Sequence, residues 1–175
     1  IDIFIISRSK KPFKIKEKNL TITILDFNQL YSLFYHSVSK FCIAKNILPK
    51  RDLKVTLSDY WSVVNETIPT IYNEKKIYHK HIRFLVLYTE YFRTKEVLDT
   101  FELAKKVSSF KSKEQVLKYI EEIPDLIRRE VSFGYIKRFF YTQAGIYKEL
   151  KEYKAQHMLY ELTHKITNSG RRTKI

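Results

Sequence analysis

The sequence predicts a mainly α protein, a bundle-like domain of several helices with a small β-hairpin or sheet at its amino end. Apolar side chains recur at helical spacing along most of the chain, and β-branched residues alternate as strands do only near its start. The 3 glycines and 4 prolines among 175 residues exclude fibrous and low-complexity proteins, and 44% hydrophobic residues are enough to bury a core. An α+β fold is the alternative.

The β element is expected at the amino end. Isoleucines alternate with other residues over 1–6, and threonines alternate with apolar residues over 20–25. Between these runs Phe13 and Ile15 alternate with lysines, which allows a third short strand. Three parts are therefore expected: a β element over residues 1–25 packed on a helical domain, the helical domain over residues 26–167, and a flexible basic tail over residues 168–175.

Helical spacing begins after Asp26, whose carboxylate can accept backbone N–H groups in the first turn of a helix. Four apolar side chains then fall on one face of that helix: Leu30, Phe34, Val38 and Phe41. Thr56 or Ser58 is expected to cap a second helix, which Pro69 ends.

Four further helical stretches are expected. They run over residues 74–92, over residues 95–107 after a cap at Thr94, from Ser112 to just before Pro124, and over residues 125–167. The inward side chains of the first three are Ile77, His81, Leu85 and Tyr88, then Val97, Phe101 and Ala104, then Val116, Tyr119 and Ile120. Those of the last are Ile136, Phe140, Tyr147, Leu150, Leu159, Leu162 and Ile166, with breaks at Gly134 and Gly145.

Cysteine content and hydropathy exclude several classes of protein. A single cysteine, Cys42, cannot build an intramolecular disulfide framework or a cysteine zinc cluster, and its apolar neighbours predict a thiol in the core. No apolar stretch approaches the roughly 18–20 residues that cross a bilayer, and no signal peptide is recognised. We therefore expect a soluble intracellular protein of the cytoplasm, nucleoid or a virion, with no membrane partner.

Positive charge is concentrated at the two ends of the chain. The 33 Lys and Arg residues exceed the 19 Asp and Glu residues and give a net charge of +14. Residues 1–55 carry +7 and residues 134–175 carry +6, whereas residues 56–100 are neutral and residues 101–133 carry +1. Because a solvated surface without a partner mixes both signs more evenly, we interpret this segregation as a surface for a polyanion, most commonly nucleic acid.

Three basic clusters are the candidate contacts to phosphate groups. The first lies in the β element: Arg8, Lys10, Lys11, Lys14, Lys16 and Lys18. The second lies in the last helical block: Lys137, Arg138, Lys148, Lys151 and Lys154. The third lies in the tail: Arg171, Arg172 and Lys174. Such contacts would release counterions from the nucleic acid, while the alternative is a solubilising surface, since lysine often guards exposed strand edges.

Residues 101–120 locally resemble a helix-turn-helix, the two-helix motif that reads DNA. Ala104 is the candidate small residue where the helices cross, and three apolar residues would set their angle: Leu103, Val107 and Phe110. The residues that would face DNA are Lys111, Lys113, Gln115 and Lys118. Ser108 stands where glycine is usual, and an ordinary pair of antiparallel helices is the alternative.

No constellation of residues indicates catalysis, so no catalytic residue, bound metal or cofactor is expected. His157, Glu161 and His164 share one helical face, but three ligands along a straight helix span about 10 Å and cannot close on one ion alone. The pattern is more typical of a surface face. The few glycines supply no P-loop, dinucleotide fingerprint or nucleophile elbow.

The leading hypothesis is a non-catalytic nucleic-acid-binding domain that contacts the phosphate backbone of DNA or RNA. The aromatic residues next to Arg138, which end at Tyr141, could stack on bases if their rings are exposed. The alternative is an architectural subunit of a viral particle or ribonucleoprotein, with mainly protein partners or copies of itself, in which the aromatic side chains fill interfaces.

Overall fold

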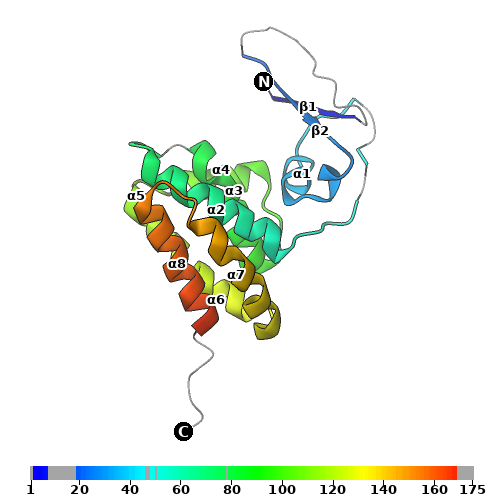
Figure 1. Cartoon of the computed structure of the whole chain (residues 1–175). Helices are drawn as coiled ribbons and strands as arrows, with labels where there is room; N and C mark the ends of the chain where they lie inside the picture. Colours follow the sequence, from blue (N-terminus) through cyan, green and yellow to red (C-terminus); the bar gives the residue numbers. More distant parts are fainter. Residues whose placement is uncertain (1, 8–18, 46–47, 50, 78, 169–175) are drawn as a thin grey trace. The chain divides into compact units, whose positions relative to one another are not determined.

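The computed structural model describes residues 2–7, 19–45, 48–49, 51–77 and 79–168. The chain divides into two compact units, Ile1–Val55 and Thr56–Ile175 (Figure 1). Helices dominate, and the only strands among the described residues form one small sheet near the amino end. The predicted mainly α class with a small β part is confirmed.

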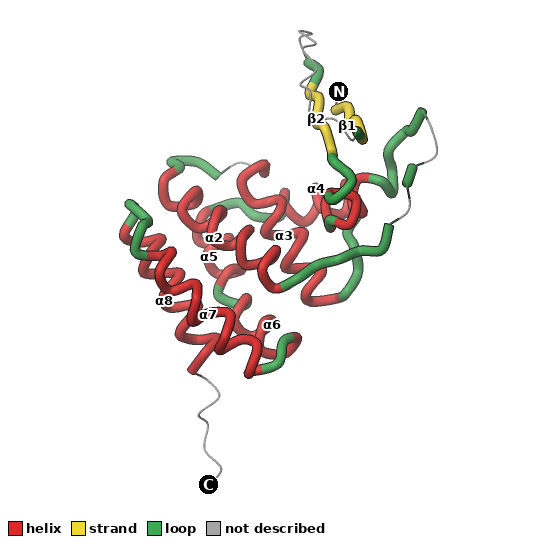
Figure 2. Tube along the Cα trace, turned by 45° about the vertical axis from the view of Figure 1, so that its right-hand side comes forward, coloured by secondary structure: helices red, strands yellow, loops and turns green. Residues whose placement is uncertain are grey.

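The sheet of the first unit is parallel. Strand β1, Asp2–Ile6, pairs with strand β2, Thr21–Leu25, so that Ile3 lies opposite Ile22 and Ile5 opposite Ile24 (Figure 2). The sheet is therefore confirmed, and the hairpin alternative is wrong because hairpin strands are antiparallel. The connection over residues 7–20 is long enough for this pairing, since a parallel pair needs a crossover of a dozen or more residues. The third strand expected around Phe13 lies outside the described residues.

The described residues of the first unit also form a short 3₁₀ helix and one α-helix. Asp26 does not cap an α-helix directly; its carboxylate accepts from the backbone N–H groups of Asn28 and Gln29, ahead of the 3₁₀ helix Gln29–Tyr31. Ser32 then caps α1, Leu33–Val38. Buried side chains join these elements to the sheet: Leu25, Leu30 and Tyr35, with Phe4, Ile6, Phe27 and Phe34 packed against them.

This first unit extends well past the residue-25 boundary expected for the β element. The Tyr35 hydroxyl donates to the carbonyl oxygen of Pro49 at 2.8 Å, and the Lys54 N–H donates to that of Tyr31 at 2.9 Å. Two expectations about its core are wrong, because α1 ends before the residues concerned. Phe41 is 59% exposed, and the Cys42 thiol is exposed as well.

The second unit begins at a cap that the sequence predicted. Thr56 accepts from the N–H of Asp59 while the Asp59 carboxylate accepts from the N–H of Thr56, and together they start α2, Leu57–Asn73. The predicted stop at Pro69 is wrong, since α2 continues through it. Ile68 and Ile71 on either side are buried, and this packing outweighs the backbone hydrogen bond that proline lacks.

The next two helices begin later than predicted. Helix α3 is His79–Thr94 and ends where Lys95 adopts a left-handed backbone conformation with φ of 63°. Asp99, not Thr94, then caps α4, Thr100–Ser108, in a second capping box. As a result α4 is rotated relative to the prediction: Val107 is buried, whereas Phe101 and Ala104 are exposed.

Where the structure describes the carboxyl-terminal part of the second unit, it contains four helices: α5, Lys113–Ile120; α6, Ile123–Glu130; α7, Phe133–Tyr147; and α8, Tyr153–Asn168. Ser112 caps α5 as predicted. In this block α8 packs against α7, α2 and α6, and Figures 1 and 2 show α7 and α8 side by side. The predicted apolar positions are buried except Leu150, which is half-buried: Ile136, Phe140, Tyr147, Leu159, Leu162 and Ile166.

A hydrogen-bonded aromatic cluster joins α2, α7 and α8. The Trp61 Nε1–H donates to the Tyr147 hydroxyl at 2.8 Å, and this hydroxyl also pairs with Thr163 Oγ1 at 3.2 Å. The ring of Trp61 meets Phe140 edge-on, with 4.6 Å between centroids. All the polar groups of this cluster are partnered, so burying them costs little.

The near-neutral middle of the chain uses its charges internally. Arg93 on α3 donates to the carboxylates of Glu90 and Glu122, each at 2.6 Å, and the buried Glu90 also accepts from the Tyr119 hydroxyl at 2.7 Å. Lys95 pairs with Glu130 at 2.7 Å. These ion pairs, together with the Tyr119 hydrogen bond, link α3 to α5 and α6.

Candidate nucleic-acid interface

Helix α7 presents a basic and aromatic face to solvent. Its opposite side is anchored by Ile136, Phe140 and Tyr147, which are buried. The helix contains no acidic residue. Its outward side therefore carries exposed rings, together with positive charge that no carboxylate of the same helix offsets.

Tyr141 lies between two cations on this face. It follows Arg138 by three residues and Lys137 by four, and residues at these spacings are neighbours on a helix surface. Tyr141 is 86% exposed, and both cations are exposed. Lys148, at the end of α7, continues the same stripe, about 16 Å along the axis from Lys137. A flat ring between cations matches the way single strands are held, by base stacking and phosphate contact.

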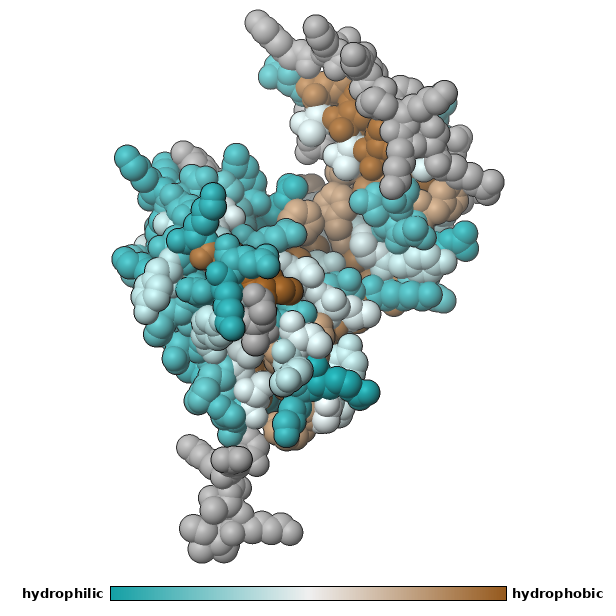
Figure 3. Space-filling view, in the orientation of Figure 1, coloured by the Kyte–Doolittle hydropathy of each residue, from teal (hydrophilic) through white to brown (hydrophobic). Residues whose placement is uncertain are grey.

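All five cations of the predicted second cluster are brought to the surface of α7, the following loop and the first turn of α8. Among the described residues none of the five takes part in an ion pair: Lys137, Arg138, Lys148, Lys151 and Lys154. The face of the second unit seen in Figure 3 is mainly hydrophilic, with pale and hydrophobic patches among the hydrophilic side chains. The cluster therefore keeps its charge available to a partner.

The other predicted cations divide into two groups. Lys111 and Lys113 serve the fold: their Nζ atoms donate to the carbonyl oxygens of Ser108 and Glu74, at the carboxyl ends of α4 and α2. Lys118 is exposed on α5. The amino-terminal and tail candidates lie outside the described residues: Arg8, Lys10, Lys11, Lys14, Lys16, Lys18, Arg171, Arg172 and Lys174.

The helix-turn-helix interpretation is not supported by the packing of α4 and α5. Both helices exist, and Phe110 between them packs on Tyr119 with 5.1 Å between ring centroids. However, Ala104 is exposed and does not lie at a helix crossing. Helix α4 packs chiefly against α3, as in an ordinary helical bundle.

His157, Glu161 and His164 lie on the exposed face of α8, as the surface interpretation predicted. Among the described residues no group of three or more His, Cys, Asp or Glu side chains could hold a metal ion. His157 instead contacts an aromatic neighbour, since its ring lies 6.4 Å from that of Tyr153.

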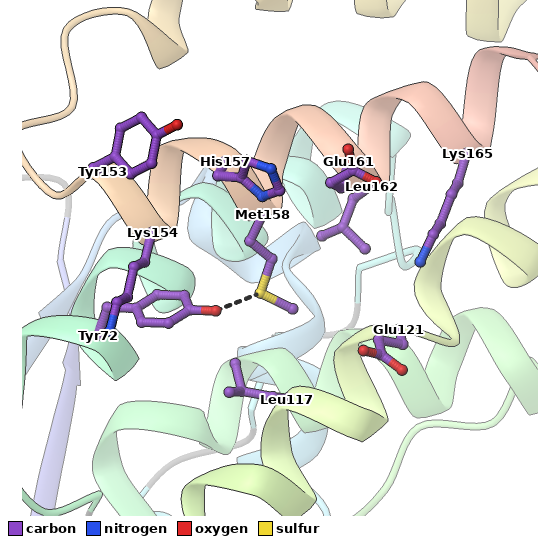
Figure 4. A pocket seen from close by; sticks show the side chains of 10 residues that line it. All are labelled: Tyr72, Leu117, Glu121, Tyr153, Lys154, His157, Met158, Glu161, Leu162 and Lys165. Carbon is purple, nitrogen blue, oxygen red and sulfur yellow. Dashed lines mark hydrogen bonds between the residues drawn. The ribbon is translucent and has the colours of Figure 1, made fainter.

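A pocket of about 460 Å³ lies beside α8 (Figure 4). Met158 and Leu162 descend from α8 toward Leu117 of α5, and the Tyr72 hydroxyl of α2 donates to the Met158 sulfur at 3.5 Å. Burial, with smaller effects from the Glu152 and Glu121 carboxylates, raises the pKa of Tyr72. The Tyr72 hydroxyl therefore stays protonated and uncharged at neutral pH.

Charged side chains surround this apolar floor. Lys154 lies on the Tyr72 side of the pocket, and Glu121 and Lys165 lie on the other side. Glu161 and His157 line the pocket from α8. Sequence reasoning missed the pocket because its walls come from α2, α5 and α8, and no local spacing pattern links the three.

Searches against protein-family models, curated proteins and solved structures give no match. Of the helices in the described part of the chain, none has the length and apolar character needed to traverse a bilayer.

Proposed function

We propose that this protein is a non-catalytic nucleic-acid-binding protein that contacts the phosphate backbone through Lys and Arg side chains. The observation that carries the proposal is the exposed Tyr141 between Lys137 and Arg138, on a helix without acidic residues. The exposed cations of the loop and of α8 extend this surface: Lys148, Lys151 and Lys154.

Electrostatics make binding to a polyanion favourable here. Each phosphate that a cation neutralises releases condensed counterions, so the logarithm of affinity falls linearly with the logarithm of salt concentration. The slope is about 0.7 per contact for single strands and about 0.9 for duplexes. Cations already engaged in internal ion pairs, such as Arg93, contribute little to this term.

A double substitution, Lys137→Gln with Arg138→Gln, is expected to weaken binding at low salt and to reduce the salt slope by about 1.4 to 1.8. Titrations of single-stranded DNA, duplex DNA and RNA over a series of salt concentrations measure both quantities. The matched control is Lys75→Gln with Lys105→Gln, which removes the same charge from exposed positions elsewhere in the second unit. An affinity of the parent protein that does not change with salt would refute the proposal.

A second function is favoured by a different observation on α7. Phe133, Tyr135 and Ile146 are exposed on this helix, and aromatic residues are enriched at protein interfaces. An architectural subunit that pairs with protein would bury them. Sedimentation in the absence of nucleic acid, together with the salt titrations above, separates the two functions. A stable oligomer that resists high salt, in a protein whose affinity for nucleic acid does not depend on salt, favours the architectural function.

A further inference from the structure

The pocket beside α8 lies next to the cations of the proposed interface. Lys154, in the first turn of α8, both lines the pocket and belongs to the basic cluster. Lys148 and Lys151 precede it along the loop between α7 and α8. A nucleic-acid backbone held by these cations would therefore pass the pocket.

The pocket floor fits the flat face of a ring. The Tyr72 side chain, the Met158 sulfur and the side chains of Leu117 and Leu162 form an apolar lining (Figure 4). Its volume of about 460 Å³ lies within the range of small-molecule sites, about 300–1,000 Å³. Tyrosine rings and thioethers both make favourable contacts with aromatic systems.

The charges around the floor indicate which part of a nucleotide enters. Glu121 and Glu161 line the pocket, and neither takes part in an ion pair among the described residues. Each carboxylate disfavours a phosphate group beside it, whereas Lys154 and Lys165, which also line the pocket, attract one. The carboxylates can accept a hydrogen bond from the exocyclic amine of a base, as Glu does from the amine of cytosine. The phosphate is thereby directed outward to Lys154, and the base inward.

We propose that this pocket receives one unpaired nucleobase carrying an exocyclic amine, from a single strand bound along α7 and α8. The inference rests on the proposed function and adds a substrate class to it: single strands are bound in preference to duplexes, whose bases are paired and stacked. Glu121 is the proposed acceptor for the amine, and Tyr72 and Met158 contact the ring.

Cytosine and uracil test the inference, because cytosine has an amine at C4, where uracil has a carbonyl oxygen that a carboxylate repels. Three DNA single strands of equal length are compared: deoxycytidine, deoxyuridine and an abasic strand. We expect the deoxycytidine strand to bind about tenfold more tightly than the other two, the discrimination of one good base contact. Glu121→Gln should remove most of that preference without weakening the binding of the abasic strand.

Two further variants make the test specific. Glu66→Gln removes another exposed carboxylate from the second unit and should leave the preference intact. Leu117→Trp fills the pocket without changing charge and should abolish the preference, with circular dichroism confirming that the variant is folded. If all three strands bind equally but with a steep salt dependence, the pocket inference is overturned and the proposed function stands. If free cytidine binds in a Glu121-dependent manner and no strand does, the proposed function fails instead.

Discussion

Replacing Trp61 with alanine is expected to lower the free energy of unfolding of the second unit by about 3–5 kcal/mol. The side chain is fully buried, meets Phe140 edge-on and donates to the Tyr147 hydroxyl at 2.8 Å. Alanine leaves a cavity and removes the donor from Tyr147. Since proteins are stabilised by only about 5–15 kcal/mol in total, this is a large part of the whole.

Denaturant titration followed by circular dichroism measures this loss. Fluorescence is unsuitable because Trp61 is the only tryptophan in the chain. Tyr153→Ala serves as the control, since it removes a ring that is 73% exposed and should change stability by no more than about 0.5 kcal/mol. Equal stability of the Trp61→Ala variant and the parent would contradict the aromatic cluster.

The same cluster orients the proposed interface. Phe140 and Tyr147 hold one side of α7 against Trp61, so Lys137 and Tyr141 are left on the opposite side. Packing and function are thus divided between two faces of one helix. Stability and affinity can therefore be changed separately, by substitutions on the inner and outer faces.

Helical periodicity predicted the core of the second unit well. Phe140, Leu159 and Ile166 are buried where their spacing placed them, and Ser112 caps the helix it was expected to cap. Such features depend on a few consecutive turns of one helix. Capping is equally local, and Thr56 starts α2 for the same reason.

Features that depend on distant contacts could not be predicted in this way. The alternation of β1 and β2 indicates strands but does not distinguish parallel from antiparallel pairing. The sequence predicts that Pro69 ends a helix, and only the burial of its neighbours shows why α2 continues. The sequence pattern predicts a DNA contact for Lys113, yet the ammonium group of this residue donates to a carbonyl oxygen at the end of α2.

The distribution of acidic and basic residues along the chain could be interpreted without knowledge of the fold. Acidic residues are frequent in the middle of the chain, and Glu90, Glu122 and Glu130 form ion pairs there. They are absent from α7, where the cations are exposed. The sequence therefore indicated where excess charge would remain, but not which cations share a face with Tyr141 or adjoin the pocket.

Raising the pH above about 10 is expected to destabilise the second unit steeply, because its buried tyrosines cannot ionise in the folded state. Burial raises the pKa of Tyr60. Burial, and next the hydrogen bond to the Glu90 carboxylate, raises the pKa of Tyr119. Below the pKa of the unfolded chain both states are protonated, and stability is complete. Above it only the unfolded chain loses protons, so each tyrosine lowers stability by about 1.4 kcal/mol per pH unit.

Chemical denaturation at a series of pH values between neutral and strongly alkaline measures this slope. Tyr119→Phe loses its hydrogen bond to Glu90 and starts less stable, but its stability should fall less steeply above pH 10, by about 1.4 kcal/mol per pH unit. Tyr60→Phe should behave in the same way. Tyr141→Phe is the control, because this side chain is 86% exposed and its replacement removes no buried hydroxyl, so the slope should not change. If all three variants lose stability with pH as steeply as the parent, the burial of tyrosines is not the cause of the alkaline transition.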